Sequence, residues 1–284
     1  MDLEDIRKHI DKVMHEQNNR KIVDFEGYSP FEMHQIINFI FEPNSPIQLQ
    51  KLSDIDYQKI PMLNQIKYLT DVIKKSGEIK LTNKGFLPTK IVSDLYEQGF
   101  IKDDHIESGI SKLYKESDSM SINLTRILME LAGLTKKRNG KLSLTKSSEK
   151  VLSNDYELLR LIFLTFAIKF NWAFYDGYGD NKIGQLGCGF SLILLSKYGY
   201  GKQLDSFYAE KYFNAYPQLL ESMESLYDTL KNQSERCYSI RTFDRFLNYF
   251  GLIILNEDGK GFDSKKYVIK SDLFDKLIKC IPPK

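Results

Sequence analysis

The stretch from Leu134 to Thr145 reads LTKKRNGKLSLT, and it predicts a β-hairpin. Asn139-Gly140 is the strongest short signal for a hairpin turn, and a short strand lies on each side of it. The preceding residues carry leucine and isoleucine at helical spacing and end near Gly133, which is typical of a helix terminus. The sequence therefore predicts a unit in which a helix is followed by a hairpin.

Two other stretches have a comparable order. After Pro61, apolar residues at helical spacing continue to Gly77, and a short alternating strand and a turn follow before a helix that begins at Pro88. Near the C-terminus, a helix ends at Gly251 and two predicted strands and a last helix follow. The three predicted units span residues 61–98, 106–152 and 236–279.

The rest of the chain is predicted to be mainly helical, except that residues 43–60 are rich in turn residues and should form an irregular connection. Ser29, Pro30 and Glu32 have the pattern of an N-cap, a first-turn proline and a capping box, so a helix should begin there. We expect a mainly α fold, α+β in detail, with multiple winged-helix-like units joined by a helical middle region. The predicted division is an N-terminal helical segment, two winged-helix-like units, the helical middle and a C-terminal winged-helix-like unit, at 1–60, 61–155, 156–235 and 236–284.

Helix, glycine, strand, tight turn and a strand with Leu-x-Leu-Thr together resemble the second half of a winged-helix module. That resemblance implies that the helix before the hairpin enters the DNA major groove and that the hairpin forms the wing. The chain also resembles a family of uncharacterised bacterial proteins, which implies a fold and a bacterial origin but no reaction. The residues that carry this second resemblance are Ser29-Pro30, Met33-His34, Lys80-Leu81-Thr82, Lys84-Gly85, Leu87-Pro88, Asn171-Trp172 and Tyr175 to Tyr178.

Composition is that of a globular protein, with 42% hydrophobic and 27% charged residues. The net charge of +2 gives no global argument for nucleic acid or membrane, so such an argument must come from local clusters. The longest apolar run, residues 161–168, is too short to span a bilayer. Three widely spaced cysteines suit a reducing compartment, and we expect a soluble, cytoplasmic protein.

Local clusters of basic residues indicate two candidate nucleic-acid contacts. The second hairpin is basic, as phosphate contact from a wing requires, although an exposed turn also collects lysines for solubility. Arg241 and Arg245 lie four residues apart on one predicted helix face, and we expect them to be exposed. The candidate residues are Lys136, Lys137, Arg138, Lys141, Arg236, Arg241 and Arg245.

Nothing in the sequence predicts catalysis. The four histidines have no metal-ligand spacing, Gly184 to Gly189 does not match a nucleotide-binding loop, and Cys188 has no histidine near it in the sequence. We therefore expect no catalytic residues, no metal and no cofactor.

The most unusual stretch, residues 171–180, is dense in aromatic, glycine and acidic residues. It has two interpretations: a ligand or partner patch formed by Trp172, Tyr175, Asp176 and Tyr178, or an aromatic loop packed over the helical core. The function that we predict is that of a non-enzymatic bacterial protein that binds nucleic acid, with DNA as a candidate partner, through its winged-helix-like units. The alternatives are a protein–protein interaction scaffold and an enzyme of unrecognised type.

Overall fold

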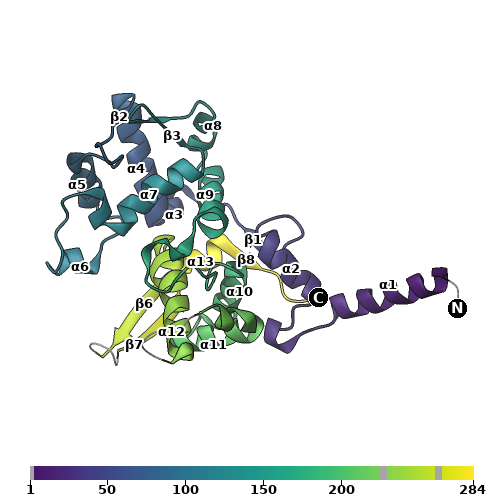
Figure 1. The fold of residues 1–284 in the computed structure, drawn as a ribbon. Coiled ribbons are helices and arrows are strands. Elements are labelled where there is room, and N and C mark those ends of the chain that lie inside the picture. The colour runs from purple at the N-terminus through teal and green to yellow at the C-terminus, as the bar shows by residue number, and fades with distance from the viewer. Residues whose placement is uncertain (1–2, 224–228, 260–263) are drawn as a thin grey trace. The chain divides into compact units, whose positions relative to one another are not determined.

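A computed structural model of the chain describes residues 3–223, 229–259 and 264–284, and it is mainly helical with small antiparallel sheets (Figure 1). The chain divides into two compact units. Unit 1 contains residues 1–50, 176–245 and 253–284, and unit 2 contains residues 51–175 and 246–252. No helix among the described residues is long and apolar enough to cross a membrane.

Unit 2 contains most of the predicted helix-and-hairpin elements. Its helices are α3 (Asp54–Tyr57), α4 (Pro61–Ser76), α5 (Thr89–Glu97), α6 (Asp104–Glu107), α7 (Met120–Leu131), α8 (Ser148–Leu152) and α9 (Asp155–Leu164), with the helical turns η2 (Glu116–Asp118), η3 (Thr165–Lys169) and η4 (Trp172–Tyr175). Its strands are β2 (Ile79–Lys80), β3 (Thr135–Arg138) and β4 (Lys141–Leu144).

The predicted hairpin is confirmed. Asn139 and Gly140 both have positive φ, at 50° and 70°, as a tight two-residue turn between twisted strands requires. Strands β3 and β4 pair from Thr135↔Leu144 to Arg138↔Lys141.

The segments 61–98 and 106–152, which were predicted as two units, share one sheet. Strand β2 from the first segment pairs with β4 from the second, and the strand order is β2-β4-β3. The pairing buries Ile79 and Leu142 on one face of the sheet, next to the buried apolar side of α4. A two-residue strand cannot form a stable sheet by itself, so the first segment completes its fold with the second.

An aromatic cluster forms part of the core of unit 2. Phe163 packs against Phe246 and Phe250, with ring centroids 4.8 and 4.7 Å apart. Phe166 and Trp172 contact the same cluster. Fully buried aromatic rings in edge-to-face contact contribute strongly to stability.

Unit 1 combines the N-terminal segment with most of the second half of the chain. Its helices are α1 (Leu3–Asn19), α2 (Pro30–Asn38), α10 (Cys188–Tyr198), α11 (Asp205–Ala215), α12 (Leu230–Ser239) and α13 (Asp272–Leu277), with the turns η1 (Val23–Phe25) and η5 (Pro217–Ser222). Helical residues η6 (Ile240–Leu247) continue from α12 and end in unit 2. Its strands are β1 (Ile47–Leu49), β5 (Gln203–Leu204), β6 (Ile253–Asp258), β7 (Lys265–Lys270) and β8 (Ile278–Cys280).

The predicted start of α2 is confirmed. The side chains and backbone of Ser29 and Glu32 form a reciprocal capping box, and Pro30 begins the helix.

Two strand pairings in unit 1 were not predicted. Strand β5, in the segment expected to be helical, pairs with β7 in a sheet of order β5-β7-β6. Strand β1, in a segment expected to be irregular, pairs with β8. These strands have two or three residues, too few to show the alternation that identifies a strand in a sequence.

Glu26 holds the N-terminal segment to two helices of unit 1. Its carboxylate accepts hydrogen bonds from Lys197 Nζ at 2.5 Å, Tyr198 Oη at 2.6 Å and Lys211 Nζ at 2.8 Å. Burial raises the pKa of Glu26, but the bonds from the two lysines and the tyrosine lower it by more, so that its pKa lies below 4.5.

We expect Glu26→Gln to lower the free energy of unfolding at pH 7 by about 1–3 kcal/mol, because it removes charge-assisted hydrogen bonds. Because the folded-state pKa is depressed, this contribution is fully present above pH 4.5 and is lost as the pH falls through the folded-state pKa. Urea unfolding of both proteins at pH 7 and pH 3 measures the difference. Asp24→Asn, which removes an exposed carboxylate two residues away, is the matched control. Equal losses at both pH values would contradict this account.

Candidate nucleic-acid interface

Two basic segments meet at the three-stranded sheet of unit 2. Residues 74–90 and 134–150 contain eleven lysines and arginines but only two acidic residues, whereas the whole chain has a net charge of +2. All eleven basic side chains are exposed. Because β2 lies in the first segment and β3 and β4 lie in the second, the β2–β4 pairing joins both segments into one surface, which we call the basic sheet.

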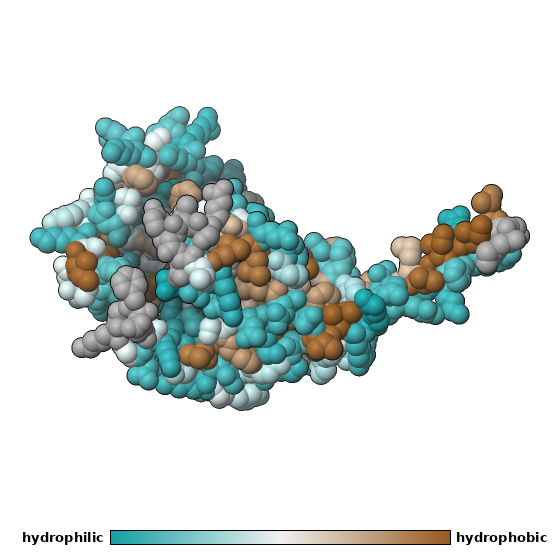
Figure 2. All heavy atoms as spheres, turned by 60° about the horizontal axis from the view of Figure 1, so that its bottom comes forward, coloured by the Kyte–Doolittle hydropathy of each residue, from teal (hydrophilic) through white to brown (hydrophobic). Residues whose placement is uncertain are grey.

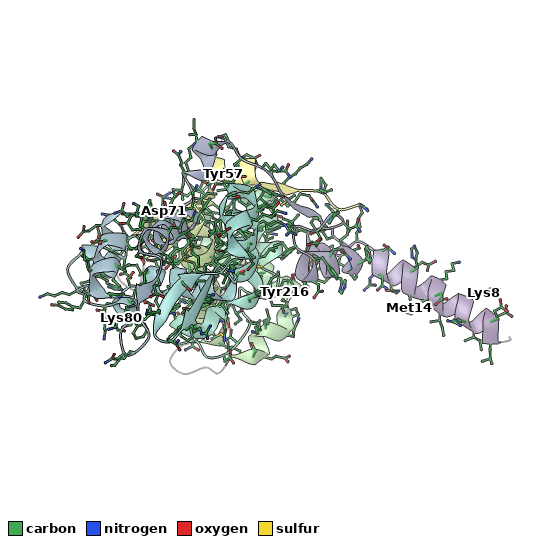
Figure 3. All side chains as sticks on the ribbon, turned by 90° about the horizontal axis from the view of Figure 1, so that it is seen from above. Lys8, Met14, Tyr57, Asp71, Lys80 and Tyr216 are labelled. Atoms are coloured by element: carbon green, nitrogen blue, oxygen red, sulfur yellow. The ribbon has the colours of Figure 1, made fainter. Side chains whose placement is uncertain are left out.

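A row of three cations crosses the basic sheet. Lys80 on β2 lies directly opposite Lys141 on β4, and Lys141 lies directly opposite Arg138 on β3. Residues that are paired in this way project from the same face, and here it is the face opposite buried Ile79 and Leu142. Figure 3 labels Lys80. Like charges directly opposite one another destabilise a sheet, so this row is favourable only if an anion neutralises it.

Only one member of the row has a carboxylate partner among the described residues. Lys141 forms an ion pair with Glu78, and both side chains are about half exposed. No ion pair forms at Lys80, Lys136 or Arg138 within the described residues. Surface pairs such as Glu78–Lys141 are weak, so they compete little with phosphate.

Successive side chains of β3 point to opposite faces of the sheet, so the predicted basic residues of the hairpin do not all lie on one face. Lys136 and Arg138 share the face of the cation row, whereas Lys137 pairs with Leu142 and belongs to the other face. The Nζ atom of Lys137 lies over Gly85, 2.0 Å from where a Cβ atom on that glycine would be. Sequence reasoning did not select Lys80, although the alternation of Ile79, Lys80 and Leu81 already indicated its direction.

The arginines that were predicted near the C-terminus are placed differently, and the expected exposure of Arg241 and Arg245 is wrong. Arg241 is only 1% exposed. Its guanidinium donates to both carboxylate oxygens of Asp176, at 2.7 and 3.0 Å, and to oxygens of Gly179, Asn181 and Ile183. The helix face that was expected to meet solvent covers this loop instead.

Arg245 also faces Asp176, with a nitrogen–oxygen distance of 3.5 Å. Burial lowers the pKa of Arg241, but the hydrogen bonds to Asp176 and the electrostatic interactions with Asp176 and other neighbours together raise it by more, so the guanidinium stays charged. Arg236 is exposed and lies at a groove of about 630 Å³ whose lining includes both acidic and basic residues, among them Asp205, Glu235, Glu257, Lys265 and Lys266. That groove lacks the single sign of charge that the basic sheet has.

The predicted patch around Trp172 is largely buried. Trp172 is 2% exposed, and its indole nitrogen donates to the carbonyl oxygen of Phe166 at 2.8 Å. The hydroxyl of Tyr175 donates to the side chain of Asn123, and the carboxylate of Asp176 is 3% exposed. Tyr178 is half-buried, and burial raises its pKa. These placements favour the second interpretation, a loop packed on the core.

The described residues also bear on a metal site and on a reactive thiol. No group of three or more histidine, cysteine or acidic side chains lies where it could hold a metal ion within that part of the chain. Burial raises the pKa of Cys188 to about 12, so its thiol is protonated and inert at neutral pH.

Comparison with known proteins gives one family match. Residues 58–157 match the family model described as Y4jL N-terminal domain. The matched residues lie within unit 2 and include every strand of the basic sheet, and the match supports the expected relation to an uncharacterised family. No curated protein and no solved structure matches the chain.

We expect Asp176→Asn to lower the free energy of unfolding by about 3 kcal/mol, because it leaves the buried guanidinium of Arg241 without its counter-charge. Urea unfolding followed by circular dichroism measures the loss. Asp258→Asn, at an exposed position on β6, is the control and should change stability by less than about 0.5 kcal/mol. A similar loss in both variants would show that the Asp176–Arg241 pair is not the reason.

Proposed function

We propose that this protein binds nucleic acid through the basic sheet of unit 2. The observation that carries the proposal is the row Lys80–Lys141–Arg138, which concentrates like charge on one exposed face. Phosphate groups relieve the repulsion within such a row, and the counterions that they release favour binding. The proposed role is non-enzymatic and belongs to a bacterial, cytoplasmic protein.

The order of elements supports a winged-helix assignment for unit 2. Helix α4, strand β2, helix α5, helix α7 and the hairpin β3–β4 occur in this order, with the short α6 and η2 between α5 and α7, and β4 lies between β2 and β3 in the sheet. This is the order of a winged-helix module, in which the hairpin is the wing. The same order occurs again in α10, β5, α11, α12, β6 and β7, with β7 in the middle of its sheet.

We assign the binding surface to the first of these two sets because of its charge. The hairpin β6–β7 carries both signs of charge outside the core. Its described residues there include Glu257 and Asp258 on β6 and Lys265 and Lys266 on β7. Acidic residues on a wing repel phosphate, so the second set lacks the property on which the proposal rests.

We expect the triple variant Lys80→Ala, Arg138→Ala, Lys141→Ala to bind duplex DNA at least 10-fold more weakly at low salt. Its plot of log affinity against log salt concentration should be shallower by about 3, because each phosphate contact contributes about 0.9 to the slope. Fluorescence anisotropy across a salt titration measures both quantities.

The matched control is Lys112→Ala, Lys169→Ala, Lys279→Ala, which removes the same charge from exposed positions outside the basic sheet. Thermal unfolding checks that the test variant folds, and we expect no loss of stability because the substitutions remove like-charge repulsion. Absence of binding by the unaltered protein to duplex and single-stranded nucleic acid at low salt would contradict the proposal. Equal weakening in both variants would do so as well.

A second candidate function is protein–protein interaction, and helix α1 is the observation that favours it. None of the residues of α1 is buried. Figure 2 shows hydrophobic side chains along this helix, and the exposed apolar residues on it are Leu3, Ile6, Ile10, Val13 and Met14. Most of the stability of an amphipathic helix in a protein comes from packing of its apolar face, so contact with an apolar partner surface would stabilise α1. The simplest partner to test is a second copy of the chain.

We expect sedimentation velocity of the unaltered protein to show species larger than 33.1 kDa that increase with concentration. Ile6→Asp with Ile10→Asp should shift the protein to monomer, because it places charge in the apolar stripe. Lys8→Ala with Lys12→Ala changes the net charge equally on the other face of the helix and should leave the association unchanged. A monomer at all concentrations would remove self-association as the role of α1.

A further inference from the structure

Helix α7 has the position of the base-reading helix in unit 2, since it comes directly before the hairpin β3–β4. A helix that enters the major groove must expose several polar side chains to the edges of the bases. In α7, eight of the twelve residues are buried, and the most exposed residue is apolar Leu131, at 42%.

The polar side chains of α7 are already hydrogen-bonded inside unit 2. Asn123 and Arg126 donate to the buried carboxylate of Glu116, Arg126 Nε at 2.7 Å. Thr125 accepts a hydrogen bond from the side-chain amide of Gln65 at 2.7 Å. Glu116 also accepts from the backbone nitrogen of Leu87, at 2.5 Å, so this network connects α7 to the segment before α5.

The partly exposed polar side chain of α7 has the wrong charge for contact with nucleic acid. Glu130 is paired with Arg126, and about a third of its side chain is exposed. A carboxylate there repels phosphate and can accept a hydrogen bond in the major groove only from the amino group of cytosine or adenine. Release of Arg126 to read a base would leave the carboxylate of Glu116 buried without its counter-charge, which is strongly unfavourable.

We infer that the protein recognises the phosphate backbone of duplex nucleic acid and does not read base sequence. This inference rests on the proposed function and specifies its ligand. The contacts come from Lys80, Lys136, Arg138 and Lys141, whose charges act on phosphate groups irrespective of the base. A side chain from the hairpin that enters the minor groove distinguishes little more than A·T from G·C pairs, because that groove has a degenerate pattern.

The surface also favours a duplex over a single strand. Proteins that bind single strands without sequence preference stack the bases on exposed aromatic rings. Residues 74–90 and 134–150 contain one aromatic residue, Phe86. It is half-buried, and the guanidinium of Arg126 lies 5.9 Å from its ring centroid. The basic sheet therefore has positive charge without a stacking platform.

The test uses the full chain and fluorescence anisotropy with five probes of equal length: a mixed-sequence DNA duplex, an A·T-rich duplex, a G·C-rich duplex, an RNA duplex and a DNA single strand. We expect the affinities for the three DNA duplexes to agree within about 5-fold, and the single strand to bind about 10-fold more weakly. The slope of log affinity against log salt concentration should be about −3 to −4 for four phosphate contacts. The RNA duplex shows whether the backbone contacts require the B form.

Arg138→Ala should weaken binding to all DNA duplexes by the same factor and make each slope shallower by about 1, whereas Lys169→Ala should change neither. Binding to one DNA duplex 100-fold tighter than to the others, or tighter binding to the single strand, would overturn this inference and leave the proposed function intact. If Arg138→Ala lowered the affinity for only one of the DNA duplexes, that result would also overturn the inference. No binding to any probe at low salt would overturn the proposed function itself.

Discussion

The pairing of β2 with β4 is the constraint on which the candidate interface depends. It brings Ile79 against Leu142 on one face and Lys80 against Lys141 on the other. Burial of the apolar pair favours the register, and that register forces the cations into one row. The sheet therefore accepts electrostatic repulsion on its outer face because the hydrophobic face fixes the alignment. A shift by one residue would exchange the two faces, so the charge of the surface and the packing of the core are not independent.

Two arginines, Arg126 in unit 2 and Arg241 in unit 1, are buried in ion pairs and do not contribute positive charge to the surface. Arg126 pairs with Glu116 and Glu130, and Arg241 pairs with Asp176 and also donates to oxygens of Gly179, Asn181 and Ile183. Such pairs add little net stability compared with apolar packing, but loss of one partner is costly. They fix the position of a helix or loop, and the second pair removes from the surface Arg241, which the sequence indicated as a nucleic-acid contact.

The two sets of helices and strands with the same order illustrate the difference between topology and function. Both contain a three-stranded sheet in which the last strand lies in the middle. The hairpin of the first set has the sequence KKRNGK at its tip, whereas that of the second has Glu257 and Asp258 on the strand before its turn. Shared topology shows that the chain uses one arrangement twice, and the exposed charges decide which copy suits phosphate.

The sequence alone determined the local features. Asn139-Gly140 specified a tight turn because few residues adopt positive φ, and Ser29, Pro30 and Glu32 specified a helix start because they satisfy the first backbone N–H groups. Tertiary structure alone decided the short strands β1, β5 and β8, the joining of two predicted units into one sheet, and the burial of Arg241 and Trp172. The physical reason is distance along the chain: these outcomes depend on partners that lie from tens to hundreds of residues away, and no periodicity or turn signal records which distant segment will cover a given face.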